Sequence, residues 1–451
     1  MIVLSRNRTE VLLKIVASGF AFPVVEIPRW ERLAENLTAA VKEDWGCDAI
    51  CLFTLECSPE DRTSNVDRYE VMECWRGRGI SAGTMWAPIS SLSSNSFVNP
   101  NEFRTFEECL HRSNGNESDQ SSPFARRGWI SELRDWTAHV IQPLGIELTG
   151  PLRQYNAGPA FNLIRFETTG PAVWFKAVGE PNLREFPITL RLAELFPMFM
   201  PEVLAIKPEW NGWLSREVDG KNLGETKDLA LWEQTAADLA RLQIQSIPES
   251  ESILRLGAHD LRFNALLFAI EPFFDVVGRL MDEQTTTSPA ILSRTELSLL
   301  RVLVDDALTL LADLQIPNML GHLDLNPGNT LVSGHGCIFL DWAEAYVGFP
   351  LFSFEYLLEH FRRQNEIGAD HRSRIFDAYT TPCRQALSND RMTEALTLSP
   401  LAAVFAYAVG TNAWKEEAKL RDPKFAGYVR SLARRMNREA IQLERRSSCL
   451  S

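Results

Sequence analysis

The apolar pattern of the chain changes from short β-type runs to longer helical repeats. Two runs rich in β-branched and aromatic residues, Phe161–Phe166 and Ala172–Val178, are separated by Thr168-Thr169-Gly170-Pro171, which favours a turn. Helical patterns follow at Leu229–Leu242, Leu254–Leu314, Phe352–Arg363, Leu401–Trp414 and Pro423–Arg445. We therefore expect a small β-rich lobe followed by a large helical lobe.

The first third of the chain has a pattern of its own. The expected strands are Thr9–Ala17, Phe22–Val25 and Ala49–Leu55, and an amphipathic helix is expected over Trp30–Trp45. Two Ser- and Asn-rich stretches, residues 88–100 and 113–123, predict loops, and the second is the best candidate for disorder. A helix over Trp129–Pro143 is expected to join this module to the next.

A polar motif interrupts the helical patterns. It runs His322-Leu323-Asp324, with Asn329 five residues later and Asp341 further on. An Asp two residues after a His, followed at this spacing by an Asn, puts a carboxylate beside a substrate hydroxyl and an amide oxygen beside a metal. The apolar stretches on either side of Ser333-Gly334-His335-Gly336 predict a hairpin that brings Asp341 back toward Asn329.

This motif resembles that of the aminoglycoside phosphotransferase and choline-kinase superfamily, which shares the protein-kinase-like fold. Leu323 stands where the family usually has Gly, and Phe349 where many members have Asp, but neither change removes a group that the chemistry needs. The resemblance implies that the phosphoryl donor is ATP, used with Mg²⁺, and that a small molecule bearing a hydroxyl group accepts the phosphoryl.

The resemblance also implies roles for the four polar residues of the motif. Asp324 is expected to be the catalytic base, and Asn329 and Asp341 are expected to be Mg²⁺ ligands. His322 is expected to brace the catalytic loop, because a His at this position more often packs and donates hydrogen bonds than reacts.

The nucleotide is expected to bind upstream of the motif. Lys176 ends an apolar run, and Glu185 lies near the start of a Leu-rich helix; in kinase-like enzymes such a pair orients the α and β phosphates. Glu194 is the second choice for the partner. A solvated lysine at a strand end is the alternative interpretation.

The phosphate-covering loop is expected between Gly158 and Asn162. This stretch resembles the short G-x-x-N turn of the phosphotransferase branch, and a backbone N–H can approach a phosphate there, although Pro159 has none to offer. The alternative is a hairpin turn that binds no ligand.

Charge narrows the classes of partner. The formal net charge is -13 at pH 7, which disfavours a nucleic-acid partner because binding to phosphates needs a basic face. The N-terminal stretch is interrupted by charged residues and resembles no signal peptide, and Leu401–Val409 is too short to span a membrane. We expect no membrane partner.

The eight cysteines are irregularly spaced. Cys47 and Cys51 lack the second pair, or the histidines, that a zinc site needs. Reduced thiols in a cytoplasmic protein are therefore expected.

The first third resembles a Nudix fold weakly, and an unrelated α+β domain is at least as good an interpretation. With Gly46 on the last Gly of the Nudix box, Glu43-Asp44 falls on its acidic pair, but Val25 replaces the first Gly and Ala39-Ala40 replaces the Arg-Glu that orients and binds the metal. The resemblance implies a degenerate module used for binding or scaffolding.

Three acids lie where the resemblance places the acceptor: Glu344, Glu355 and Glu359. Glu355 and Glu359 are four residues apart on an expected helix, where like charges repel. An amine-bearing acceptor would relieve this repulsion. A solvated helix face is the alternative, and spacing alone favours it.

The expected fold class is α+β, with a bilobal protein-kinase-like fold preceded by a separate small α/β or α+β domain. The expected parts are an N-terminal domain (1–128), a connecting helix (129–147), a β-rich lobe (148–220) and a helical lobe (221–451) that holds the catalytic loop (321–345). The expected function is ATP-dependent phosphoryl transfer to a hydroxyl. The alternatives are a pseudokinase-like nucleotide-binding module and, disfavoured by the missing glutamate of the Nudix box, phosphohydrolysis at the N-terminal domain.

Overall fold

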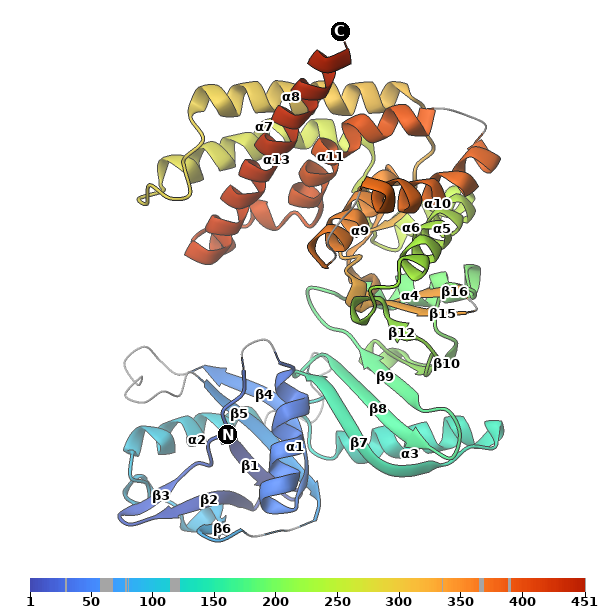
Figure 1. The fold of residues 1–451 in the computed structure, drawn as a ribbon. Coiled ribbons are helices and arrows are strands. Elements are labelled where there is room, and N and C mark those ends of the chain that lie inside the picture. The colour runs from blue at the N-terminus through green and yellow to red at the C-terminus, as the bar shows by residue number, and fades with distance from the viewer. Residues whose placement is uncertain are drawn as a thin grey trace. The chain divides into compact units, whose positions relative to one another are not determined.

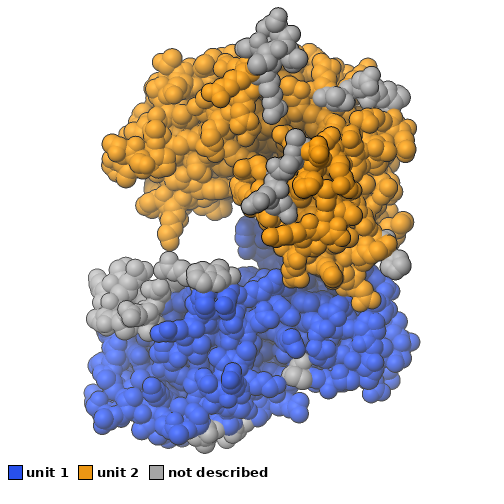
Figure 2. Space-filling model, viewed as in Figure 1, with its two compact units in different colours: residues 1–186, 202–217 blue, residues 187–201, 218–451 orange. Residues whose placement is uncertain are grey.

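The computed structural model describes residues 1–28, 31–56, 68–77, 79, 81–113, 122–334, 336–364, 369–387 and 391–450. The chain divides into two compact units, coloured separately in Figure 2. Unit 1 contains residues 1–186 and 202–217, and unit 2 contains residues 187–201 and 218–451. The chain last passes from unit 1 to unit 2 between Glu217 and Val218.

The first sheet of unit 1 has six strands in the order β3-β2-β1-β5-β4, with β6 paired to β2. Among the described strands of this sheet, β1 and β5 pair in parallel and the other pairs are antiparallel. The strands are β1 (Ile2–Ser5), β2 (Glu10–Val16), β3 (Gly19–Ala21), β4 (Asp48–Glu56), β5 (Arg68–Arg76) and β6 (Thr84–Pro88).

Two helices cover the two faces of this sheet (Figure 1). Side chains alternate along β1, so Val3 packs in one cluster with Leu37 and Val41 of α1 (Leu33–Trp45), whereas Leu4 packs in another with Phe106 of α2 (Pro100–Ser113). Both faces of the sheet are therefore buried.

The second sheet of unit 1 has five antiparallel strands in the order β10-β11-β9-β8-β7. Helix α3 (Trp129–Ile141) packs against it, and Phe124, Trp129 and Trp210 contact one another edge to face beneath β9. The strands are β7 (Leu148–Ala157), β8 (Asn162–Thr168), β9 (Val173–Ala177), β10 (Val203–Lys207) and β11 (Gly212–Arg216).

The two sheets of unit 1 share one hydrophobic core, which runs from Ile2 through Trp129 to Phe175. The buried side chain of Gln154 joins them further, since it accepts a hydrogen bond from the Cys51 backbone N–H at 2.7 Å and donates one to the Cys51 carbonyl at 3.0 Å. The N-terminal sheet is thus packed onto the five-stranded sheet. Whether residues 1–128 also fold by themselves stays a prediction.

Unit 2 is mainly helical (Figure 1). Its helices are α5 (Leu229–Gln245), α6 (Ser250–Arg255), α7 (Phe263–Asp282), α8 (Arg294–Asp313), α9 (Leu351–Gln364), α10 (Ala369–Leu387), α11 (Arg391–Gly410), α12 (Glu417–Leu420) and α13 (Pro423–Leu450), with most of α4 (Glu185–Leu195). Two small sheets complete it: β12 (Lys221–Asn222), β15 (Thr330–Ser333) and β16 (Gly336–Phe339), and β13 (His259–Leu261), β17 (Ala345–Gly348) and β14 (Met319–His322). None of the helices, over the described part of the chain, is long and apolar enough to cross a membrane.

The predicted α+β class is confirmed, and most predicted elements are present within a few residues. The strand expected at Phe22–Val25 is wrong, because the pairing with β2 is made by Gly19–Ala21 instead. Phe22 is buried among Tyr69, Phe97 and Phe106, and Pro23 has no N–H to donate to a strand ladder.

Helices α2 and α10 were not predicted. Of the predicted N-terminal helix, Trp30 lies outside the described residues, as does the centre of the loop expected to be disordered, residues 114–121.

Candidate active site

The loop after β14 fixes the carboxylate of Asp324 from two sides. The side-chain amide of Asn326 donates to Asp324 Oδ1 at 3.1 Å, and that of Asn329 donates to Asp324 Oδ2 at 3.3 Å and to the Asp324 carbonyl at 3.0 Å. Asn326 Oδ1 in turn accepts the Gly328 N–H at 2.8 Å and caps the short 3₁₀ turn Pro327–Asn329. Local side-chain bonds therefore hold the loop in one conformation.

His322 links this loop to the strand that precedes Asp341. Its Nδ1 accepts the Asp324 backbone N–H at 3.0 Å, so the proton lies on Nε2, which donates to the Leu340 carbonyl at 3.0 Å. Burial lowers the pKa of His322 below its ordinary value. The ring is therefore neutral and connects two backbone segments.

The predicted hairpin between Asn329 and Asp341 is present. Thr330 of β15 pairs with Phe339 of β16, and the Leu340 N–H donates to the Asn329 carbonyl at 2.8 Å. The turn residue His335 lies outside the described residues. Asp341 follows at φ 63° and ψ 62°, a left-handed conformation that Asp adopts more readily than most residues, and it is exposed. The hairpin thus brings the two expected metal ligands to the same end of one small sheet.

The donor set fits Mg²⁺. Asn329 uses its amide nitrogen for Asp324, and its Oδ1 accepts no hydrogen bond from any residue that the structure describes. Asp341 adds a carboxylate. The described residues contain no cluster of three or more His, Cys, Asp or Glu that could hold a metal, but Mg²⁺ on a nucleotide takes only one or two carboxylates and completes its shell with phosphates and water.

Lys176 and Glu185 form an ion pair within unit 1. Lys176 lies on the central strand β9, between Leu163 of β8 and Trp213 of β11, while Glu185 is the first residue of α4 and its side chain is only 2% exposed. The second choice, Glu194, pairs with Arg191 instead and is 69% exposed. Glu185 is therefore the partner that the structure gives to Lys176.

The loop between β7 and β8 places Gly158 beneath the ring of Phe161. A Cβ at Gly158 would lie 2.3 Å from that ring, so only glycine fits with the ring in this position. Asn162 is buried, and its Oδ1 accepts from Gln154 Nε2 at 3.0 Å, while its amide nitrogen donates to no described residue. The Asn162 side chain thus bonds Gln154, the residue of β7 that joins the two sheets, and one buried donor stays open at the end of the loop.

Tyr356 was missed by the sequence reasoning. It lies on α9, and its hydroxyl donates to Asp324 Oδ1 at 3.3 Å. Burial raises the pKa of Tyr356 well above its ordinary value, and the charge of Asp324 adds to this, so the phenol stays protonated. Its ring packs on that of His360, with the centroids 4.8 Å apart. No local sequence pattern indicates the bond to Asp324, which lies 32 residues earlier.

The acids expected near the acceptor are engaged within the protein. Glu344 bonds His259 Nε2 at 3.0 Å, and Glu355 accepts from the Ser399 hydroxyl at 2.7 Å. Glu359 lies in ion pairs with neighbouring arginines rather than opposite an uncompensated Glu355. The repulsion that suggested an amine-bearing acceptor is therefore relieved by the protein itself.

Residues 183–387 match the phosphotransferase enzyme family. The predicted resemblance is thus confirmed over a span that includes Glu185, Asp324, Asn329 and Asp341 but not Lys176. No curated protein sequence matches the chain. The match does not reach the first third, where the Nudix-like resemblance stays a prediction.

Solved structures similar to the chain include small-molecule kinases. A choline kinase from Streptococcus pneumoniae is 13% identical, with a TM-score of 0.42, over 68% of this chain and 99% of that one. A choline kinase from Cryptosporidium parvum is 13% identical, with a TM-score of 0.47, over 76% and 97%. A macrolide 2'-phosphotransferase from Brachybacterium faecium is 18% identical, with a TM-score of 0.39, over 65% and 98%. Similarities at these low scores decide nothing about the chemistry, for which the family match and the geometry of the site are the grounds.

Proposed function

We propose that the protein is an ATP-dependent phosphotransferase that moves the γ-phosphoryl group of ATP to a hydroxyl of a small molecule. The observation that carries this proposal is a hydroxyl group, that of Tyr356, donating to Asp324 Oδ1 at 3.3 Å. A catalytic base must accept a hydroxyl proton over a distance of this order. The family match over residues 183–387 supports the same chemistry.

In the proposed reaction, Asp324 accepts the proton of the acceptor hydroxyl. The acceptor oxygen forms a bond to the γ-phosphorus while the bond from that phosphorus to the β–γ bridging oxygen breaks, and the electron pair leaves with ADP. In-line transfer of this kind needs positioning and charge stabilisation more than covalent chemistry.

The other site residues have supporting roles in this proposal. Lys176, held by Glu185, binds the α and β phosphates, and the backbone near Gly158 covers them. When bound at Asn329 and Asp341, Mg²⁺ neutralises charge on the phosphates. The neutral ring of His322 holds the Asp324 backbone and the segment before Asp341 in place through its two hydrogen bonds.

A screen of ADP release tests the proposal. The full chain is incubated with Mg²⁺ and ATP, or GTP in parallel, across a library of small hydroxyl compounds. Release that depends on one class of compound is expected. If calorimetry shows that nucleotide binds but no compound stimulates ADP release, the pseudokinase-like alternative is favoured. In that alternative the biological function belongs to the N-terminal domain.

We place this activity in the cytoplasm, where thiols stay reduced, with a small molecule and neither nucleic acid nor membrane as the partner. Amine-bearing acceptors stay in the screen. The repulsion between Glu355 and Glu359, which was the main reason to expect an amine, is however relieved by the ion pairs of Glu359.

A further inference from the structure

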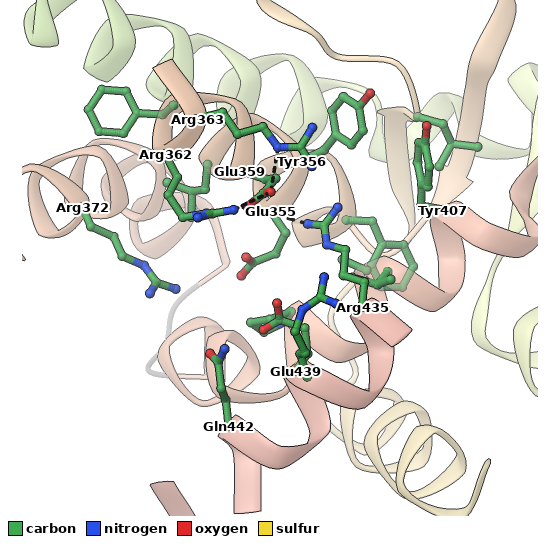
Figure 3. A pocket seen from close by; sticks show the side chains of 18 residues that line it. Glu355, Tyr356, Glu359, Arg362, Arg363, Arg372, Tyr407, Arg435, Glu439 and Gln442 are labelled. Atoms are coloured by element: carbon green, nitrogen blue, oxygen red, sulfur yellow. Dashed lines mark hydrogen bonds and ion pairs between the residues drawn. The ribbon is translucent and has the colours of Figure 1, made fainter. Parts of the chain in front are cut away.

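A cavity of about 430 Å³ lies in unit 2 among helices α9, α10, α11 and α13 (Figure 3). Leu323 of the catalytic loop and Tyr356 line it. Small-molecule sites have volumes of roughly 300–1,000 Å³. Asp324 does not line the cavity, but Tyr356 joins the cavity wall to the carboxylate that is proposed to accept the proton, because its hydroxyl donates to Asp324 Oδ1 at 3.3 Å.

Arginines outnumber acids on the wall of this cavity. Five arginines and three glutamates line it, although the whole chain has a formal net charge of -13. The arginines are Arg362, Arg363, Arg372, Arg435 and Arg438. The cavity wall is therefore positively charged although the chain as a whole is negatively charged.

Glu359 lies within ion-pair distance of three of these arginines. Its carboxylate pairs with Arg362 Nε and Arg363 Nε, each at 2.8 Å, and lies 3.9 Å from Arg435 (Figure 3). Burial alone would raise the pKa of Glu359, but the arginines outweigh it and lower the pKa to about 2. A carboxylate so compensated has little attraction left for a cationic ligand.

Two arginines of the wall remain, Arg372 and Arg438, both exposed, together with the glutamates Glu355, which accepts from the Ser399 hydroxyl, and Glu439. Arg372 and Arg438 form neither an ion pair nor a side-chain hydrogen bond with any residue in the described part of the chain. The guanidinium of Arg372 points into the cavity in Figure 3. A guanidinium offers a planar fork of donors that matches a carboxylate or a phosphate.

We propose that this cavity binds the acceptor and that the acceptor carries an anionic group, a carboxylate or a phosphate ester, besides the hydroxyl that reacts. Arg372 and Arg438 bind the anionic group, and the reacting hydroxyl takes the place of the Tyr356 hydroxyl at Asp324. This inference rests on the proposed function and names its substrate class.

Two sets of polyhydroxyl compounds that differ mainly in charge test the inference. Glucuronate, glucose and glucosamine present similar hydroxyls with an anionic, neutral or cationic group, and the triplet of glycerate, glyceramide and 3-amino-1,2-propanediol does so at a smaller size. Glycerol 3-phosphate separates a phosphate ester from a carboxylate. Ligand-observed NMR with the full chain measures binding, and ADP release measures turnover.

The anionic members are expected to bind best and to support any turnover that the triplets show. Arg372→Gln with Arg438→Gln should weaken their binding and raise their KM by about tenfold or more, the loss typical of a charged hydrogen-bond donor. The KM of ATP should stay unchanged. The control is Arg255→Gln with Arg445→Gln, two exposed arginines of the same unit outside the cavity.

Preferential binding of the amine or neutral members would overturn the inference, as would anion binding that the double variant leaves intact. Absence of binding by every anionic probe would overturn it too, whatever the turnover. Failure of the proposed function looks different, because anions would then bind in an arginine-dependent way while no compound stimulates ADP release.

Discussion

Replacing Asp324 by Asn separates catalysis from folding, because the substitution keeps the size of the side chain and removes its charge. The Asp324 carboxylate accepts hydrogen bonds from Asn326, Asn329 and Tyr356 at 3.1, 3.3 and 3.3 Å. An amide has one oxygen, so its NH₂ group must face at least one former donor. The lost hydrogen bond costs about 1 kcal/mol, which lowers Tm by roughly 2–4 °C for a unit of this size.

The effect on turnover should be much larger. Loss of a general base lowers kcat by about two to four orders of magnitude, equivalent to roughly 3–5 kcal/mol of barrier. The KM of ATP should change little, because the carboxylate is proposed to contact the acceptor rather than the nucleotide. The catalytic and folding effects are thus expected to differ several-fold in free energy.

The assay compares kcat at saturating ATP, ATP affinity by calorimetry and Tm for Asp324→Asn, wild type and Asp306→Asn, an exposed control on α8. Near wild-type turnover on the acceptor found by the screen would refute the assignment of the base. A loss of turnover that merely follows a loss of folded protein would refute the reasoning about the magnitudes.

Three further predictions use the same measurements. Asp341→Ala should weaken nucleotide binding more with Mg²⁺ than without it, since it removes a hard oxygen ligand; equal losses in calorimetry would mark Asp341 as structural. Lys176→Met removes the ion pair of the Glu185 side chain, which is 2% exposed, and should destabilise the protein by about 3 kcal/mol. Adding Glu185→Leu should restore Tm but not ATP affinity, and recovery of both would contradict the phosphate-binding role. The pKa of Glu359 is lowered from 4.5 to about 2, so its stabilisation is complete above the ordinary pKa and is lost as pH falls toward the lowered one. In urea unfolding, wild type should therefore exceed Glu359→Gln by on the order of 3 kcal/mol at about pH 6 and by much less near pH 3, and a pH-independent difference would exclude this linkage.

Local chemistry explains why parts of the site were predictable. The hairpin after Asn329 needs only two apolar runs and a turn between them, all within a dozen residues, and β15 and β16 lie within one or two residues of the expected runs. Lys176 and Glu185 are nine residues apart, so a strand that leads directly into a helix brings them within reach. Interactions over such short separations leave a readable pattern.

Long-range packing explains the errors. The run Phe22–Val25 has residues typical of a strand. Phe22 is instead buried among Tyr69, Phe97 and Phe106, which lie far along the chain. Tyr356 bonds Asp324, which lies 32 residues earlier in the chain, and no sequence pattern near either residue indicates the contact. The expected repulsion between Glu355 and Glu359 is an error of another kind, because Arg362 and Arg363, three and four residues after Glu359 on the same helix, pair with it at 2.8 Å. Only the weaker contact at 3.9 Å comes from α13.

The sequence by itself determined the α+β class, the polar motif and the order of the expected phosphoryl-transfer groups, because these depend on periodicity and on spacing within single elements. Only the tertiary structure decided that the N-terminal sheet shares its core with the five-stranded sheet. It also decided which charges line the cavity that Tyr356 joins to Asp324. Both depend on which distant side chains are buried together, and the gain from burying them arises from contacts that the order of residues along the chain does not record.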